Sequence, residues 1–271
     1  MVNDSTRAYS VYISDENNSV QGSGVLFYAG GKSAFVFTCA HVVDGLEKIR
    51  LFILKEINAA CDRYDVFCTE ISSSQVVYSP LDEVRTDDAG TKTHTEDLAI
   101  IQLGKPESLE IPVTNFLITE TYRNRPVYVQ GYPNGVPDGR SPIEYLDCLH
   151  GCVVVNPADS NRFTIRMDNT FIDAGSRVYE LEGLSGAPVW EDSEEVNGLL
   201  GVFTSAYGAT ALLSKTFVTK AQQLRSIMKE RFGIVMKRKL EGIPEQDVAG
   251  SSGDPIVFNG EIQTEEKSET L

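Results

Sequence analysis

Short apolar runs separated by turn residues recur along most of this chain, and they constrain its fold more than any other feature. Runs such as AYSVYI, GVLFYA, DLAIIQL and PVYVQGY are bounded by Gly, Asp, Asn or Pro. Short strands with turn signals between them are typical of an all-β sandwich or barrel. A chain of 271 residues has room for one large β domain or for two barrels divided near residues 115–125.

Helical periodicity is clear only near the end of the chain, over residues 219–231. Its apolar positions, spaced i, i+3, i+4 and i+8, are Leu224, Ile227, Met228 and Phe232. They predict a helix with one apolar face, and Gly233 is expected to end it. The polar and then acidic composition of residues 237–271 predicts a flexible tail. Within the tail, PIVFNGEI is interpreted either as a strand added to a sheet or as part of an unstructured end.

The charge of the chain argues against a nucleic-acid ligand. The net charge is −15, and a field of that sign repels phosphate backbones, although an acidic surplus also serves solubility. No apolar run approaches the roughly 18 residues of a membrane helix, so no membrane partner is expected. The N-terminus has no basic segment followed by an apolar one, so a secretory signal is not expected either.

The cysteines predict a reducing compartment. The chain has five of them, at positions 39, 61, 68, 148 and 152, an odd number without the spacing of a disulfide framework. We therefore expect free thiols and a cytoplasmic location. A zinc site of Cys148, His150 and Cys152 is the alternative, but it lacks a fourth ligand, so neither a metal nor a cofactor is expected.

Three short motifs carry the candidate chemistry. His41 follows an apolar strand in TCAHVV, Asp97 opens the apolar run DLAII, and Ser185 stands between glycines in GLSGAP. A serine hydroxyl needs an adjacent base to attack a carbonyl, and imidazole titrates near neutral pH. A buried carboxylate fixes the imidazole tautomer. The backbone N–H groups of Gly183 and Ser185 are the predicted oxyanion donors.

Each motif alone has a simpler structural interpretation. A histidine at a strand end, an aspartate before a strand and a GxSG turn are all common without catalysis. Their combination in the chain order His, Asp, Ser favours nucleophilic catalysis, and this order excludes the α/β-hydrolase arrangement, in which serine comes first.

With these motifs, the chain resembles the trypsin/chymotrypsin-like peptidases, and within them bacterial trypsin-like peptidase domains similar to the high-temperature-requirement proteases. The segments that carry the resemblance lie between about residues 8 and 210; they are GSGV (22–25), TCAHVV, EDLAIIQL, VYVQGYP (127–133), GLSGAPVW and GVFTSAYG (201–208). The resemblance implies two six-stranded antiparallel β-barrels with the site between them. We expect residues 1–118 to form the first barrel, with His41 and Asp97, and residues 119–236 the second barrel and helix, with Ser185.

The chain also departs from the family pattern. Leu184 occupies the position at which digestive proteases carry the aspartate that pairs with a newly cut N-terminus. Activation by N-terminal cleavage is therefore not expected. We also expect neither the family disulfides nor a PDZ domain in this chain.

The resemblance places a specificity pocket less clearly. It implies that Tyr179 lies at the pocket floor and that residues 203–206 form a wall and the strand that pairs with substrate; these are Phe203, Thr204, Ser205 and Ala206. Thr204 is expected near the triad carboxylate. Glu182, with Glu180, either favours a basic side chain in the substrate or is a solvated surface carboxylate.

The sequence therefore predicts a cytoplasmic serine endopeptidase with a selective protein substrate, gated either by a ligand or by an activating or inhibiting protein partner. The alternative is a catalytically silent binding module that keeps the trypsin fold and docks a protein partner.

Overall fold

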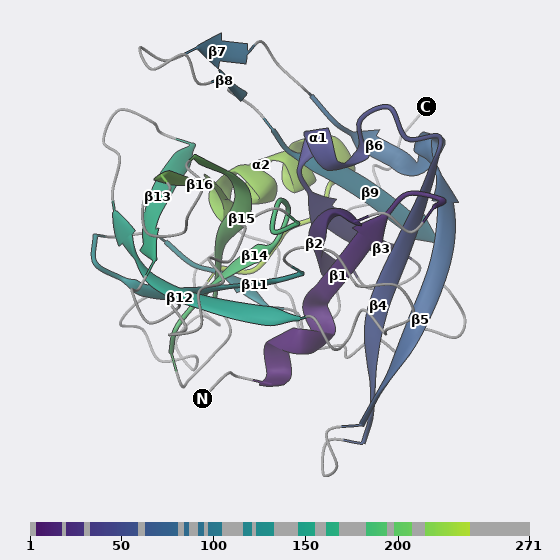
Figure 1. Cartoon of the computed structure of the whole chain (residues 1–271), viewed down its shortest axis with the longest axis horizontal. Coiled ribbons are helices and arrows are strands. Elements are labelled where there is room, and N and C mark those ends of the chain that lie inside the picture. Colours follow the sequence, from purple (N-terminus) through teal and green to yellow (C-terminus); the bar gives the residue numbers. More distant parts are fainter. Residues whose placement is uncertain are drawn as a thin grey trace, which may run out of the picture.

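Two sheets lie side by side and carry almost all the regular structure (Figure 1); their strands pair antiparallel except for β10, which pairs parallel with β15. The structure is a computed structural model. It describes residues 4–17, 20–29, 33–58, 63–80, 84–86, 92–94, 97–104, 116–120, 123–132, 146–154, 161–167, 183–193, 198–207 and 215–238.

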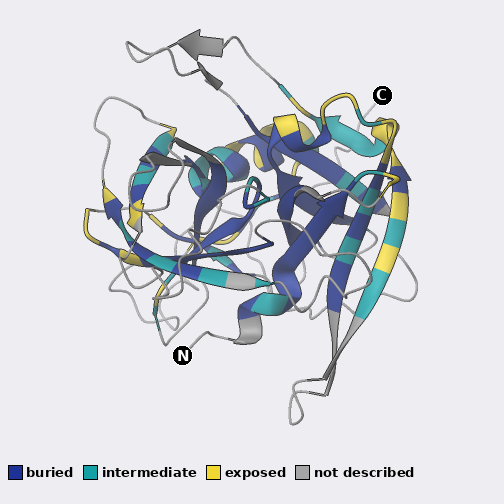
Figure 2. Cartoon of the chain, in the orientation of Figure 1, coloured by how far each residue is buried: buried dark blue, intermediate teal, exposed yellow. Residues whose placement is uncertain are grey.

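The first sheet is built from the N-terminal part of the chain. Within the described residues its strand order is β5-β4-β1-β2-β3-β9-β6, and all neighbours pair antiparallel. The strands are β1 (Ser10–Ser14), β2 (Val20–Tyr28), β3 (Ser33–Thr38), β4 (Lys48–Asn58), β5 (Arg63–Ser72), β6 (Val76–Tyr78) and β9 (Ala99–Gly104). A separate hairpin joins β7 (Val84–Thr86) to β8 (Lys92–His94). Figure 2 shows β1 and β3 buried along most of their length, whereas the edge strand β5 is partly exposed.

The second sheet closes on itself. Its order in the described residues is β10-β15-β14-β11-β12-β13-β16, and β15 also pairs with β16, which completes a six-stranded barrel with β10 added outside. The strands are β10 (Leu117–Ile118), β11 (Pro126–Gly131), β12 (Asp147–Val154), β13 (Arg162–Met167), β14 (Pro188–Glu191), β15 (Gly198–Tyr207) and β16 (Lys215–Lys220).

The predicted trypsin-like double barrel is confirmed, with one difference in the first half. There the sheet is a curled half-barrel, because no pairing joins its edge strands β5 and β6 in the described part of the chain. Alternating strand patterns predict which faces are buried, but edge-to-edge closure depends on contacts between segments distant in sequence.

The predicted C-terminal helix is present as α2 (Ala221–Phe232). Leu224, Ile227 and Met228 are buried on its inner face, and the Phe232 ring lies 5.6 Å from that of Phe35 on β3. Gly233 ends the helix with a φ of 68°, and its N–H donates to the Lys229 carbonyl. A left-handed residue at this position favours glycine, as the sequence indicated.

Two apolar clusters are present; one lies within the second barrel, and the other spans both halves and includes the N-terminal segment. Tyr9 is the last residue of the short helix η1 (Asp4–Tyr9). The centre of its ring lies 5.5 Å from that of Phe116 and 5.8 Å from that of Trp190 on the second sheet. Ser10 Oγ on β1 donates a hydrogen bond of 3.2 Å to Gln130 Oε1 on β11. These contacts fix how the strands that carry the candidate site residues face each other.

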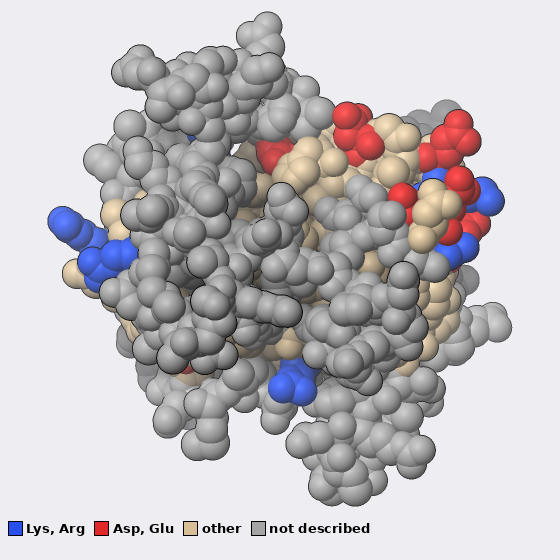
Figure 3. All heavy atoms as spheres, in the orientation of Figure 1, with Lys and Arg blue, Asp and Glu red and all other residues tan. Residues whose placement is uncertain are grey.

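The described surface shows no single sign of charge on the face in Figure 3. Acidic and basic side chains alternate at the end of β4 and β5, where Lys48 and Arg50 both pair with Glu70. Among the described helices, none is long and apolar enough to cross a membrane.

Lys237 and Arg238, the first residues of the predicted tail, lie beside β10, where the Ile118 N–H donates to the Lys237 carbonyl at 2.9 Å. Residues 239–271 lie outside the described residues.

Candidate active site

The pairing of β3 with β9 brings His41 and Asp97 together. Thr38, at the end of β3, pairs with Ala99, at the start of β9. Because the strands run antiparallel, continuing this register places Asp97 opposite the start of α1 (Ala40–Val43), which carries His41. An apolar strand that ends in a short helix thus presents the imidazole at the edge of the buried sheet.

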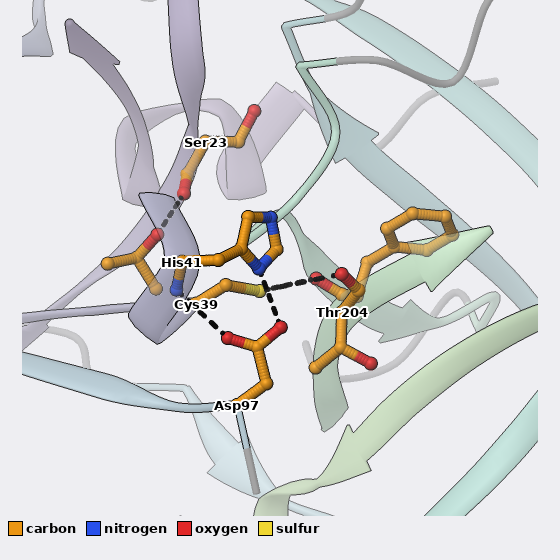
Figure 4. Close-up of polar contacts among 7 residues, drawn as sticks. Ser23, Cys39, His41, Asp97 and Thr204 are labelled. Atoms are coloured by element: carbon orange, nitrogen blue, oxygen red, sulfur yellow. Dashed lines mark hydrogen bonds and ion pairs between the residues drawn. The ribbon is translucent and has the colours of Figure 1, made fainter. Parts of the chain in front are cut away.

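Both carboxylate oxygens of Asp97 hold His41. Oδ2 lies 2.6 Å from His41 Nδ1, and Oδ1 accepts the His41 backbone N–H at 3.1 Å (Figure 4). The Asp97 side chain is only 7% exposed, whereas that of His41 is 37% exposed. An acceptor at Nδ1 favours the tautomer with the proton on Nδ1, which leaves the Nε2 lone pair free to take a proton.

Ser185 stands in a tight turn over residues 183–187 between the two sheets. The Ala187 N–H donates to the Leu184 carbonyl at 2.8 Å, and the Gly186 N–H donates to the Phe203 carbonyl of β15 at 2.7 Å. The Ser185 carbonyl accepts the N–H of Ser23 on β2 at 2.8 Å. The turn is therefore fixed by backbone bonds both within itself and to each sheet.

The two predicted oxyanion donors are available in this turn. Within the described residues, the N–H groups of Gly183 and Ser185 donate to no acceptor. Gly183 has a φ of 87°, a conformation that favours glycine. Unpaired N–H groups that flank a serine hydroxyl can stabilise a negative oxygen that develops there.

Close packing places the serine turn against the segment that carries His41. A Cβ added to Gly186 would lie 1.9 Å from the Ser23 carbonyl oxygen and 2.2 Å from Thr38 Oγ1. A Cβ on Gly22 would lie 2.7 Å from both the Ser185 carbonyl oxygen and a methyl group of Val42. Among the described residues, no hydrogen bond joins Ser185 Oγ to His41. Such bonds often shorten only when substrate binds.

The family follows from a sequence profile as well as from this geometry. The profile of the trypsin-like peptidase domain matches residues 22–199, more than half of the chain. This chain belongs to the trypsin-like peptidase domain family. The resemblance seen in the sequence is thereby confirmed, and membership of a peptidase family implies a protein substrate.

The peptidase domain is similar to the crystal structure of the MamO protease domain from Magnetospirillum magneticum in its apo form, with a TM-score of 0.46. The two share 14% sequence identity, over 82% of this chain and 96% of that chain. No curated protein matches the chain in a sequence comparison.

Four of the six predicted pocket residues lie in the part of the chain that the structure describes. Tyr179 and Glu182 lie outside the described residues. Phe203 is buried in the apolar core of the second barrel, and its carbonyl accepts the Gly186 N–H, so it supports the serine turn. Thr204 is buried and lies beside Cys39 and Asp97 in Figure 4. The backbones of Ser205 and Ala206 pair with β16, and β14 pairs only with the preceding part of β15.

Cys39 lies next to the His41–Asp97 pair but is not arranged as a nucleophile. Its side chain is fully buried, and its Sγ donates to the Phe203 carbonyl at 3.2 Å. Burial raises the pKa of the Cys39 thiol well above its usual range, and the charge of Asp97 raises it further. The thiol therefore stays protonated at neutral pH and acts as a packed donor.

Metal binding finds little support in the described residues. Only Cys39, His41 and Asp97 there have ligand atoms within 4.8 Å of one another, and these atoms already hydrogen-bond to one another or to Phe203. The alternative zinc ligands Cys148, His150 and Cys152 are alternate residues of β12. They share one face of the strand, but Cys148 and Cys152 stand about 13 Å apart along it, so the three side chains cannot all reach one ion.

We predict that the thiols are free and that Cys39 is protected in the folded protein. Cys39, Cys68, Cys148 and Cys152 form no disulfide among the described residues, and Cys61 lies outside them. A titration with Ellman's reagent in denaturant should find five thiols per chain. In native buffer Cys39 should react far more slowly than exposed Cys68, because it is buried and its raised pKa suppresses the thiolate. A disulfide in the denatured titration would contradict this prediction.

Sequence reasoning missed one residue of the site. Ser23 entered only as part of the GSGV motif, yet its hydroxyl donates to the Gly183 carbonyl at 2.8 Å. The signal was a small polar residue flanked by glycines in an otherwise apolar strand, which is typical of a backbone that another segment approaches closely.

Proposed function

We propose that this chain is a serine endopeptidase that hydrolyses peptide bonds of a selective protein substrate through an acyl-enzyme. The observation that carries the proposal is the His41–Asp97 pair, in which one carboxylate oxygen contacts the imidazole and the other accepts the backbone N–H of the same histidine. A binding module would gain nothing from a buried carboxylate held against a half-exposed histidine.

In the proposed reaction, His41 Nε2 removes the proton from Ser185 Oγ as that oxygen attacks the substrate carbonyl. The carbonyl oxygen becomes negative and accepts hydrogen bonds from the N–H groups of Gly183 and Ser185. The imidazolium, held by Asp97, then gives its proton to the leaving amine, and water hydrolyses the acyl-enzyme by the same route. This sequence needs no metal or cofactor.

The backbone of β15 supports a role in aligning an extended substrate. In the described residues, Ser205–Tyr207 pair with β16 on one side and with no strand on the other. An extended peptide could add to that edge by backbone hydrogen bonds.

We propose the cytoplasm as the location, which the free thiols among the described cysteines support.

A fluorophosphonate probe tests the enzymatic proposal directly. The folded chain should be labelled, and peptide mapping should locate the adduct on Ser185, because only a base-activated serine attacks such a probe. Heat-denatured protein is the control and should stay unlabelled. A folded chain that takes up no probe would favour the silent binding module instead.

Labelling with the same fluorophosphonate probe, applied to a shortened chain, tests gating by a partner. The tail is the proposed docking segment because PIVFN is a short apolar stretch within polar sequence. The comparison should use a chain that lacks residues 239–271, since Lys237 and Arg238 contact β10. If the tail regulates access, the shortened chain should differ from the full chain in its labelling rate or casein turnover. Identical values would leave the tail without a regulatory role.

A further inference from the structure

Ser23 contacts the serine turn with both its backbone and its side chain. It lies on β2 in the first sheet, and it is fully buried. Its N–H donates to the Ser185 carbonyl at 2.8 Å, and its Oγ donates to the Gly183 carbonyl, also at 2.8 Å. One residue of the first sheet therefore holds two carbonyls of a turn that belongs to the second half of the chain.

The direction of the side-chain bond is fixed by a third partner. The Tyr132 backbone N–H donates to Ser23 Oγ at 2.9 Å. Because a carbonyl can only accept and an N–H can only donate, the hydroxyl proton of Ser23 must point to the Gly183 carbonyl. The single hydroxyl proton is thus committed to the turn.

The two carbonyls that Ser23 holds stand on either side of the peptide that joins Leu184 to Ser185. That peptide carries the Ser185 N–H, one of the proposed oxyanion donors, and the Gly183 carbonyl belongs to the peptide next to the other donor. A peptide group is planar, so holding its carbonyl fixes the direction of its plane. Neither held carbonyl belongs to a peptide that carries a donor. Ser23 therefore restricts the donors through neighbouring peptides: those on both sides of the Ser185 N–H, and the one next to the Gly183 N–H.

Ser23 itself has little freedom to move. Its carbonyl accepts a hydrogen bond of 2.7 Å from Thr38 Oγ1 at the end of β3 (Figure 4). Gly186 packs so closely against this carbonyl that even a methyl group would not have room there. Ser23 is therefore held rigidly in the first sheet, and a rigidly held residue can fix the geometry of a neighbouring turn.

We propose that Ser23 is a positioning residue that fixes the serine turn, and with it the oxyanion donors, from the first sheet. Its effect on chemistry rests on the proposed peptidase function, but its hold on the turn does not. Ser23 touches no reacting atom in this role and acts through Gly183 and Ser185.

Ser23→Ala is the test variant, and Ser10→Ala is its matched control. Ser10 is also a buried serine, and its Oγ also bonds to the second sheet, at Gln130. Both variants lose one buried hydroxyl that bridges the two halves, but only Ser23 contacts the serine turn. Any effect of general destabilisation should therefore appear in both.

The first measurement is native hydrogen exchange, which does not depend on activity. In Ser23→Ala the amides of Gly186 and Ala187, which donate to Phe203 and Leu184, should exchange roughly 10-fold faster or more, because the turn opens locally. In Ser10→Ala they should exchange at a rate set by global stability alone. Equal exchange in the two variants would overturn the proposal.

The second measurement separates kcat from KM on a peptide substrate. We expect Ser23→Ala to lower kcat roughly 10-fold to 100-fold with KM nearly unchanged, less than the 100-fold or more that follows loss of an oxyanion donor itself. Ser10→Ala should keep kcat. Faster exchange in Ser23→Ala with an unchanged kcat would overturn its positioning role in the reaction.

A second variant and a readout that does not need activity keep the test decisive. If Ser23→Ala does not fold, Ser23→Cys retains a weak donor of similar size and should show the same changes to a smaller degree. If the wild-type chain takes up no fluorophosphonate, the peptidase proposal fails, while the exchange comparison still decides whether Ser23 holds the turn.

Discussion

Replacing Ser185 by alanine should abolish peptide-bond cleavage while the protein stays folded. The hydroxyl of Ser185 is the only proposed source of the attacking oxygen, and His41 cannot activate an alanine. Loss of the nucleophile in a triad costs on the order of 10⁶ in turnover. The measurement is turnover of a cleavable protein or peptide substrate, with the circular dichroism spectrum and melting temperature recorded on the same samples.

The fold should survive this change because the bonds that fix the turn do not use the hydroxyl. The Ser185 carbonyl accepts from Ser23, and the Ala187 N–H bonds to Leu184. We expect the melting temperature to change by no more than about 2 °C. Ser74→Ala, at an exposed position between β5 and β6, is the matched control and should keep full activity. Undiminished cleavage by Ser185→Ala would remove Ser185 from the mechanism.

Much of this site could be predicted because its parts are encoded locally. An apolar strand must end before a polar histidine can reach the surface, which TCAHVV shows. An aspartate that opens an apolar strand is a candidate for a paired carboxylate, and glycines around a serine indicate a tight turn. Each feature appears in a few consecutive residues, so a sequence reveals it without knowledge of the fold.

The remaining features depend on contacts between distant segments. The open first sheet reflects the missing pairing of β5 with β6 in the described residues. The Tyr9, Phe116 and Trp190 cluster joins three separate parts of the chain. The hydrogen bond from Ser23 to Gly183 spans 160 residues. Local patterns set which residues are buried, but they do not state which buried residues meet.

Leu184 shows how the sequence and the structure complement each other. The sequence indicated that it could not form the ion pair that switches digestive proteases on. In the structure its side chain is fully buried in the apolar core of the second barrel, with Ala187 and Val189. Burying a leucine side chain contributes about 2 kcal/mol, so apolar packing stabilises the turn at this position.

Replacing Asp97 by asparagine should nearly abolish activity without unfolding the protein. An asparagine can still accept the His41 backbone N–H through its amide oxygen, which preserves the local structure. Its NH₂ group would then face His41 Nδ1, where the carboxylate oxygen now lies at 2.6 Å. That contact favours the tautomer with the proton on Nε2, so the nitrogen that should act as base has no free lone pair. The equivalent change in a well-studied triad lowers kcat about 10⁴-fold.

Single-turnover kinetics and fluorophosphonate labelling measure the effect on the chemical step. Both rates should fall together in Asp97→Asn, because both require activation of Ser185 by His41. Asp44→Asn is the matched control: Asp44 directly follows α1, is exposed, and should tolerate the same change without loss. A wild-type rate in folded Asp97→Asn would mean that another carboxylate, with neighbouring Glu96 the first candidate, orients the base. In that case the 2.6 Å contact between Asp97 and His41 would be structural, and the catalytic assignment of Asp97 would be wrong.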